Sequence, residues 1–196
     1  MTALPDVLYR RVTLEGFMPL MFDRYPGDNK TTLPVGAKFY FLPDGKTICI
    51  PASNIVSFLS ATNTSSAAKL VGGKTYKALA AALLGFVQIS PMSIPITREG
   101  KPIQFSGFVN DRDEDAQAYV DRRVARLPRG IPNPKERPVL ELPWEASFDL
   151  TMFKNDEFDE EALKVIFAKG GIALGLGTFR GLFGKFIVKE WTTREP

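Results

Sequence analysis

Six glycines fall within the fifteen residues 170–184, and this density limits what the C-terminal part of the chain can fold into. Inside a helix or strand, glycine costs roughly 0.5–1 kcal/mol relative to alanine, so a loop is expected here. Glycine also adopts backbone conformations denied to other residues and lets a backbone approach a ligand closely. The segment therefore predicts a glycine-rich loop with a binding role, following a helix and preceding the last strand.

The chemistry expected of this loop is anion binding combined with base stacking. Successive backbone N–H groups in such loops can form an anion-binding concavity. Arg180 and Lys185 add positive charge, and Phe179, Phe183 and Phe186 offer ring faces on which a nucleic-acid base can stack. These residue types together favour a nucleic-acid ligand.

Two familiar phosphate-binding motifs are excluded. Residues 175–180 carry Arg180 where a dinucleotide fingerprint needs its third glycine, and they follow a helix where a strand is required. Residues 68–75 resemble a relaxed P-loop, but Ala68 replaces its first glycine and the preceding residues are polar, unlike a buried strand. Lys74 stays a candidate contact for a nucleic-acid phosphate.

A second basic segment lies in the middle of the chain. Six basic residues occur within positions 122–137, and four of them are candidate phosphate contacts: Arg122, Arg123, Arg126 and Arg129. Such contacts bind a strand without reading its sequence. The alternative is a solvated surface loop with scattered ion pairs.

The order of predicted elements indicates the fold class. Strands are expected near 11–20, 86–97, 142–152 and 185–191, with helices over 52–59 and 75–85 and from Asp156 or Asp159 to Gly170-Gly171. Residues 61–73 are expected to be a flexible loop. Without insertions the order is strand, helix, strand, strand, helix, strand. We expect a single α+β, ferredoxin-like domain over 1–196 with an antiparallel sheet and two helices. Its insertions are a loop and hairpin over 22–50 and a long basic insertion over 98–143.

The absence of histidine narrows the possible chemistry. With 0 His and 1 Cys, the sequence lacks Ser-His-Asp and Cys-His arrangements and has too few ligands for a zinc site. We therefore expect no enzymatic activity, no metal and no cofactor. A metal-dependent nuclease that uses carboxylates is a less favoured alternative, and Asp23 and Asp28 are interpreted as turn residues.

The glycine-rich segment resembles a known signature. Residues 175–177 and 183–186, between the last helix and last strand, are similar to the glycine-rich loop of the RAMP superfamily, the RNA-binding subunits of CRISPR effector complexes. Residues 14–21 (LEGFMPLM) are similar to the first strand of the backbone subunits of these complexes. The whole chain also resembles uncharacterised tailed-phage proteins, in which residues 51–55 and 175–180 recur in similar form.

The RAMP resemblance implies a binding role. It places five residues of the loop against a nucleic-acid backbone: Gly175, Gly177, Arg180, Gly181 and Gly184. It also implies head-to-tail assembly of copies, as a homo-oligomer or filament, along a strand. Because some RAMP nucleases use a catalytic histidine that this sequence lacks, cleavage does not carry over.

The resulting hypothesis is a non-catalytic protein that binds single-stranded DNA or RNA, or a hybrid duplex. The first residues, Met1–Asp6, lack a signal-peptide pattern, and no apolar run reaches the ~20 residues of a membrane span. A cytoplasmic location without a membrane partner is therefore expected. The competing hypothesis is a phage structural protein that binds a protein partner.

Overall fold

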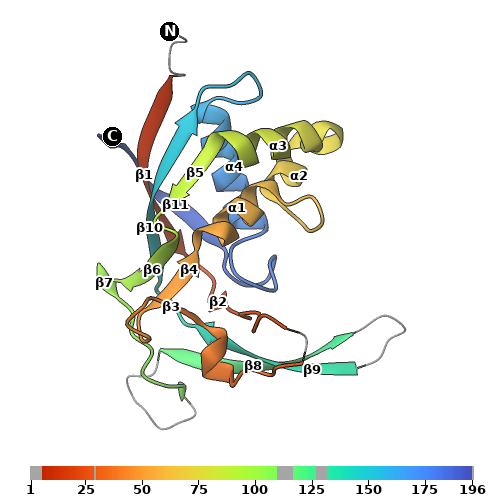
Figure 1. Ribbon diagram of the computed structural model, residues 1–196, viewed down its shortest axis with the longest axis vertical. Coiled ribbons are helices and arrows are strands. Elements are labelled where there is room, and N and C mark those ends of the chain that lie inside the picture. Colours follow the sequence, from red (N-terminus) through yellow and green to blue (C-terminus); the bar gives the residue numbers. More distant parts are fainter. Residues whose placement is uncertain (1–5, 29, 110–116, 127–131, 196) are drawn as a thin grey trace.

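The computed structural model describes residues 6–28, 30–109, 117–126 and 132–195 (Figure 1). The strands of its main sheet are β1 (Val7–Gly16), β3 (Tyr40–Phe41), β4 (Ile48–Pro51), β5 (Val87–Ser90), β6 (Ser93–Arg98), β7 (Lys101–Pro102), β10 (Glu145–Phe153) and β11 (Phe186–Thr193). They lie in the order β11-β1-β10-β6-β4-β3, with β5 also pairing with β10 and β7 with β6. Every pairing is antiparallel. The fold is therefore mixed α and β around an antiparallel sheet, as predicted.

Helices cover one face of this sheet (Figure 1). They are α1 (Ala52–Ser60), α2 (Ala67–Gly72), α3 (Tyr76–Phe86) and α4 (Glu160–Ala173), with 3₁₀ turns η1 (Val35–Lys38) and η2 (Gly73–Thr75). The expectation of two helices is wrong, because the described residues hold four α-helices. Helix α2 forms where a flexible loop was predicted, since the Ser66 side chain accepts a hydrogen bond from Lys69 N and Ala67 and Ala68 are fully buried.

Strand β10 shows how the sheet separates a core from a polar face. Ala146, Phe148, Leu150 and Met152 are buried, and they alternate with side chains that are only partly buried. Phe148 packs near Phe167 of α4, with ring centroids 6.2 Å apart. The opposite face carries polar pairs between neighbouring strands, such as Thr13 with Ser147 at 2.9 Å. This period-two pattern was readable in the sequence.

A second sheet forms from segments that lie between strands of the main sheet in the sequence. It contains β2 (Leu20–Met21), β9 (Pro132–Leu140) and β8 (Ala118–Arg126), in the order β2-β9-β8. Strands β8 and β9 pair from Ala118↔Leu140 to Arg126↔Pro132 and form a hairpin that extends away from the main sheet (Figure 1). The base of this hairpin is fastened by an ion pair of Arg137 with Asp23, 2.8 Å from Nε to Oδ2.

The predicted hairpin around residues 43–45 is confirmed. Strands β3 and β4 pair with Tyr40 opposite Cys49, and Leu42 N donates to Thr47 O at 2.9 Å. The Asp44 carboxylate accepts hydrogen bonds from Lys46 N and Thr47 N in the turn. Because β4 also pairs with β6, this hairpin extends the main sheet.

Helix α4 begins where the sequence predicted but ends later. The Asp159 carboxylate accepts a hydrogen bond from Ala162 N at 2.8 Å, which confirms it as the N-cap. The expectation that Gly170-Gly171 ends the helix is wrong, since α4 continues to Ala173. A Cβ at Gly170 would lie 2.6 Å from the Phe58 ring, and one at Gly171 would lie 2.5 Å from Phe186 O. These two glycines therefore let α4 pack closely on α1 and β11.

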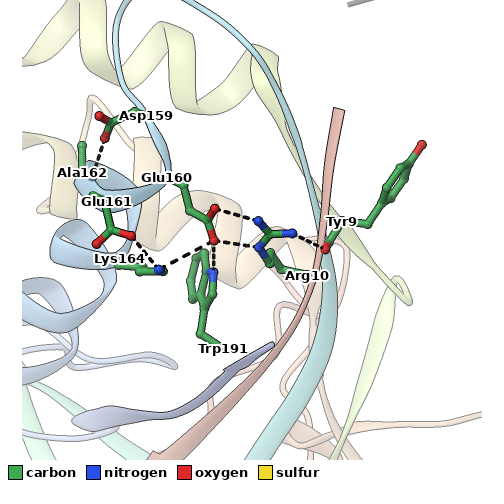
Figure 2. Close-up of polar contacts among 8 residues, drawn as sticks. All are labelled: Tyr9, Arg10, Asp159, Glu160, Glu161, Ala162, Lys164 and Trp191. Carbon is green, nitrogen blue, oxygen red and sulfur yellow. Dashed lines mark hydrogen bonds and ion pairs between the residues drawn. The ribbon is translucent and has the colours of Figure 1, made fainter. Parts of the chain in front are cut away.

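An ion-paired cluster ties α4 to the edge of the sheet (Figure 2). Arg10 of β1 donates from Nε and Nη2 to the two carboxylate oxygens of Glu160, both at 2.7 Å. Trp191 Nε1 of β11 donates to the same carboxylate at 2.7 Å. The hydrogen bond from Arg10, then the one from Trp191, lower the pKa of Glu160 to about 2, against the opposing effect of burial.

Within the described residues, no helix combines the length and the apolar character needed to cross a membrane.

Candidate nucleic-acid interface

The glycine-rich loop runs from the end of α4 to β11 and packs closely on itself. After α4, Leu174 N and Gly175 N both donate to Gly170 O, at 2.8 and 3.1 Å, and Gly175 has φ +80°. A Cβ at Gly175 would lie 2.6 Å from the carbonyl of Gly184, and one at Gly184 would lie 2.0 Å from Leu176 O. Both glycines are buried, so their contacts are with protein atoms.

At position 177 a glycine is required because the chain passes close to the backbone of β2. Its φ is +75°, and a Cβ there would lie 2.4 Å from Met21 O in β2. Its N–H donates to Asn54 Oδ1 of α1 at 3.0 Å. Asn54 thus joins the two segments, 51–55 and 175–180, on which the phage resemblance rested. No local pattern in the sequence indicates this contact, because it joins residues 123 positions apart.

The expected anion-binding concavity of backbone N–H groups is wrong for the four glycines of the loop. Gly175, Gly177, Gly181 and Gly184 all donate to protein oxygens: Gly170 O, Asn54 Oδ1, Leu174 O and Pro19 O. A folded loop satisfies its backbone groups internally wherever water is excluded, so these N–H groups are unavailable to an anion. Binding by this loop has to come from its side chains.

The tip of the loop is open. Gly181 is exposed with φ +91°, and a Cβ there would meet nothing within 4 Å. Phe179 also has a positive φ, +54°, and its side chain is 49% exposed. Phe183, four residues later, is 5% exposed and packs with Met21 and Val139 in a small core under the loop.

Arg180 carries the least compensated charge near the loop. Its guanidinium donates from Nη1 to Ser65 O at 3.2 Å and from Nη2 to Ser57 Oγ at 3.3 Å, both uncharged acceptors. Burial lowers the pKa of Arg180, because no carboxylate offsets the loss of solvent. Among the described residues, neither Arg180 nor Lys185 forms an ion pair.

The basic hairpin is more neutral than its sequence suggests. Arg122 pairs with Glu136 across the strands at 2.7 Å, with both side chains largely exposed. Arg123 Nε donates to both carboxylate oxygens of Asp121, at 2.8 and 2.9 Å. Lys135 makes no ion pair within the described part of the chain. The side chain of Arg126 and the whole of Arg129 lie outside the described residues.

The hairpin and the glycine-rich loop meet through Arg123. Its guanidinium carbon lies 5.3 Å from the Phe179 ring centroid and 5.0 Å from that of Phe183. These distances are those of cation–π contacts. Two segments that are 56 positions apart in the sequence, counting from Arg123 to Phe179, therefore share one surface.

Lys74 lies elsewhere in the fold. It is exposed in η2, between α2 and α3, and no contact among the described residues joins it to the loop. Helix α2 precedes it, where a P-loop needs a buried strand. No group of three or more carboxylate or cysteine side chains within the described residues is placed to hold a metal ion.

The comparisons with known proteins bear on the fold. No protein-family model and no curated protein matches the chain. One matching solved structure is described as "Cryo-EM structure of the Type III-B Cmr-beta bound to cognate target RNA", with a TM-score of 0.56 and 13% sequence identity. The match covers 96% of this chain and 61% of that chain, so this chain spans less than two thirds of its neighbour. The likeness shows that this chain shares its fold with the matched part of that structure.

Proposed function

We propose that this protein binds single-stranded DNA or RNA, or a hybrid duplex, on the surface shared by the glycine-rich loop and the β8–β9 hairpin, without cutting it. The observation that carries the proposal is the contact of Arg123 with Phe179 and Phe183. It brings together the two segments that the sequence nominated independently, and we propose that one ligand contacts both.

The uncompensated cations supply the attraction for a phosphate backbone. Arg180 and Lys185 belong to the loop, and Lys135 belongs to the hairpin. The Arg180 guanidinium is held by neutral oxygens, and an anionic ligand would offer it a stronger, charge-assisted hydrogen bond. Backbone contacts of this type favour affinity without sequence readout.

The architecture supports a ferredoxin-like, RAMP-type assignment. The strand order β11-β1-β10-β5, with α1–α3 in one crossover and α4 in the other, is that of a split βαβ domain. On this reading residues 1–196 form one RAMP-like domain, and the β8–β9 hairpin is its basic insertion. The neighbour of similar fold was solved with target RNA bound, which favours a nucleic-acid ligand and assembly with further subunits.

The alternatives make different predictions for the same surface. A phage protein that binds a protein partner would not respond to salt as a phosphate binder does. For a carboxylate nuclease, we consider Asp23 and Asp28, which lie in the loop after the first strands. Asp23 is paired with Arg137, and Asp28 accepts hydrogen bonds from Lys30 N and Thr31 N, as expected of a turn residue. Neither observation favours catalysis.

The test is a binding panel by fluorescence anisotropy with single-stranded DNA, single-stranded RNA, a hybrid duplex and double-stranded DNA at two salt concentrations. We expect salt-dependent binding to the single strands or the hybrid, with no cleavage when magnesium is added. An Arg180→Ala/Lys185→Ala variant should bind more weakly. Arg11→Ala is the matched control, because Arg11 is an exposed arginine in β1 paired with Asp149 of β10. Salt-independent binding or none would contradict the proposal.

A further inference from the structure

Phe179 combines two features that each cost free energy in the unliganded protein. A phenylalanine at φ +54° occupies the left-handed region, which costs roughly 1–2 kcal/mol for an L-residue with a β-carbon. The residue is nonetheless 49% exposed, so burial recovers only part of that cost. Backbone strain of this kind persists at ligand-binding sites, where the bound state uses the geometry.

The Phe179 ring is held in place by contacts with Phe183 and Arg123. Phe183, which is almost fully buried, meets the Phe179 ring edge to face at a centroid distance of 6.3 Å and an interplanar angle of 60°. Arg123 lies over both rings, and the carboxylate of Asp121 holds its guanidinium with two hydrogen bonds. The Phe179 ring is thus oriented before any ligand arrives.

The charge of Arg123 points to a role other than phosphate contact. Its Nε–H is shared between the two carboxylate oxygens of Asp121, at 2.8 and 2.9 Å, so a neighbour on the same strand already balances part of its charge. What remains is a flat guanidinium that stacks against aromatic rings. Arg123 therefore acts through Phe179 as a positioning residue.

We infer that the Phe179 ring, held by Arg123 and Phe183, is a stacking platform for one unpaired base. Of the ligands proposed above, it makes the protein favour single strands over base-paired duplexes, the hybrid duplex included. This inference rests on the proposed function and adds the part of the ligand that is recognised. A base in a duplex is already stacked on both faces, so it can reach the ring only after unpairing. Base–aromatic stacking tolerates any base, because each has a π-face.

The experiment uses two single strands of the same length. The first is a short DNA or a short RNA, whichever the protein binds more tightly, and the second is an abasic strand. Phe179→Ala should weaken binding of the base-containing strand by about fivefold to a hundredfold, which is the range for loss of one stacked base. The slope of log affinity against log salt should not change, because no phosphate contact is lost. The abasic strand should bind the wild type and the variant equally.

Two further variants separate stacking from folding. Phe86→Ala is the matched control, since Phe86 is also half-exposed, at 40%, but ends α3 on the helical side of the molecule. It should bind both strands like the wild type. Arg123→Lys keeps the charge but loses the flat surface, so it should weaken the base-containing strand at an unchanged salt slope.

Wild-type affinity of Phe179→Ala for the base-containing strand would overturn the inference and leave the proposed function standing. An equal loss on the abasic strand would also overturn it, since that result indicates a distorted loop. Wild-type protein that binds neither strand would instead contradict the proposed function itself.

Discussion

Two arginines of this protein, Arg10 and Arg180, occupy opposite electrostatic situations. Arg10 gives two 2.7 Å hydrogen bonds to the Glu160 carboxylate, and both side chains are largely buried, at 15% and 22% exposed. Arg180 is half-buried too, but it reaches only a backbone carbonyl and a serine hydroxyl, at 3.2 and 3.3 Å. The hydrogen bond to Glu160 raises the pKa of Arg10, whereas burial lowers that of Arg180.

The difference separates a structural charge from one that is available to a ligand. The Arg10–Glu160 pair fastens β1 to α4, and removing either partner would leave the other charge partly buried and less well compensated. Arg180 has no such partner within the described residues, and an incoming anion would improve its surroundings.

The largest effect is expected from Arg10→Ala. Removing one partner of a fully buried ion pair costs about 3–5 kcal/mol, but Trp191 and Lys164 would still contact Glu160 here. We therefore expect a loss of about 2–3 kcal/mol in the free energy of unfolding, measured by urea denaturation, without a change in nucleic-acid affinity. Wild-type stability would mean that the pair contributes nothing, and the contrast with Arg180 would disappear.

The second effect is the pH dependence that Glu160 contributes. Its pKa falls from 4.5 to about 2 in the folded protein, so its stabilisation is present above the unfolded value and is lost as pH falls toward about 2. Allowing for solvent screening, we expect about 2 kcal/mol from this group. Glu160→Gln should therefore lower stability at about pH 6 and approach the wild type at about pH 3. A constant gap between the two proteins would contradict this.

The third effect is on binding. Arg180→Ala should weaken affinity for a single strand about tenfold, the effect of one charge-assisted hydrogen bond, measured by anisotropy at low salt. The melting temperature should change little, because the lost acceptors, Ser65 O and Ser57 Oγ, can turn to water. Full-strength binding by a stably folded Arg180→Ala protein would remove Arg180 from the site.

The smallest effect concerns the hairpin. If Arg122 and Arg126 each contact one phosphate, replacing both by alanine should flatten the salt dependence of binding by about one to two units. The exposed pair of Arg122 with Glu136 does not prevent this, because exposed ion pairs are worth about 0–1 kcal/mol and exchange readily. An unchanged slope would place the hairpin away from the strand.

Local patterns in the sequence predicted several elements correctly. The alternation in 142–152 predicted β10 and its buried face, and Asp159 was one of the two predicted caps of α4. Helix α2 was missed because its stability comes from burial of Ala67 and Ala68 rather than from a local pattern. The end of α4 was misplaced because Gly170 and Gly171 serve helix packing: each lies too close to a phenylalanine, Phe58 or Phe186, to carry a β-carbon. Both phenylalanines are distant in sequence.

For the candidate site, sequence reasoning nominated the right neighbours for incomplete reasons. It selected the glycines because they let a backbone approach a ligand. At Gly175, Gly177 and Gly184, however, the close approach that excludes a β-carbon is to other backbone atoms of the protein. It selected Arg123 as a phosphate contact, and the structure pairs Arg123 with Asp121 and two aromatic rings. Whether Arg122, Arg126, Arg129 and Lys74 contact a strand stays a prediction.

Short-range properties could be read from the sequence: the alternation of buried and exposed residues in β10, the start of α4 and the turn between β3 and β4. These properties depend on residues within a few positions of one another. Long-range contacts became visible in the three-dimensional structure alone: Arg123 lies over Phe179, Asn54 accepts a hydrogen bond from Gly177 N, and Arg10 rather than Arg180 has a carboxylate partner. Those contacts join residues from 56 to 150 positions apart, and strand pairing and helix packing bring them together, which no local pattern specifies.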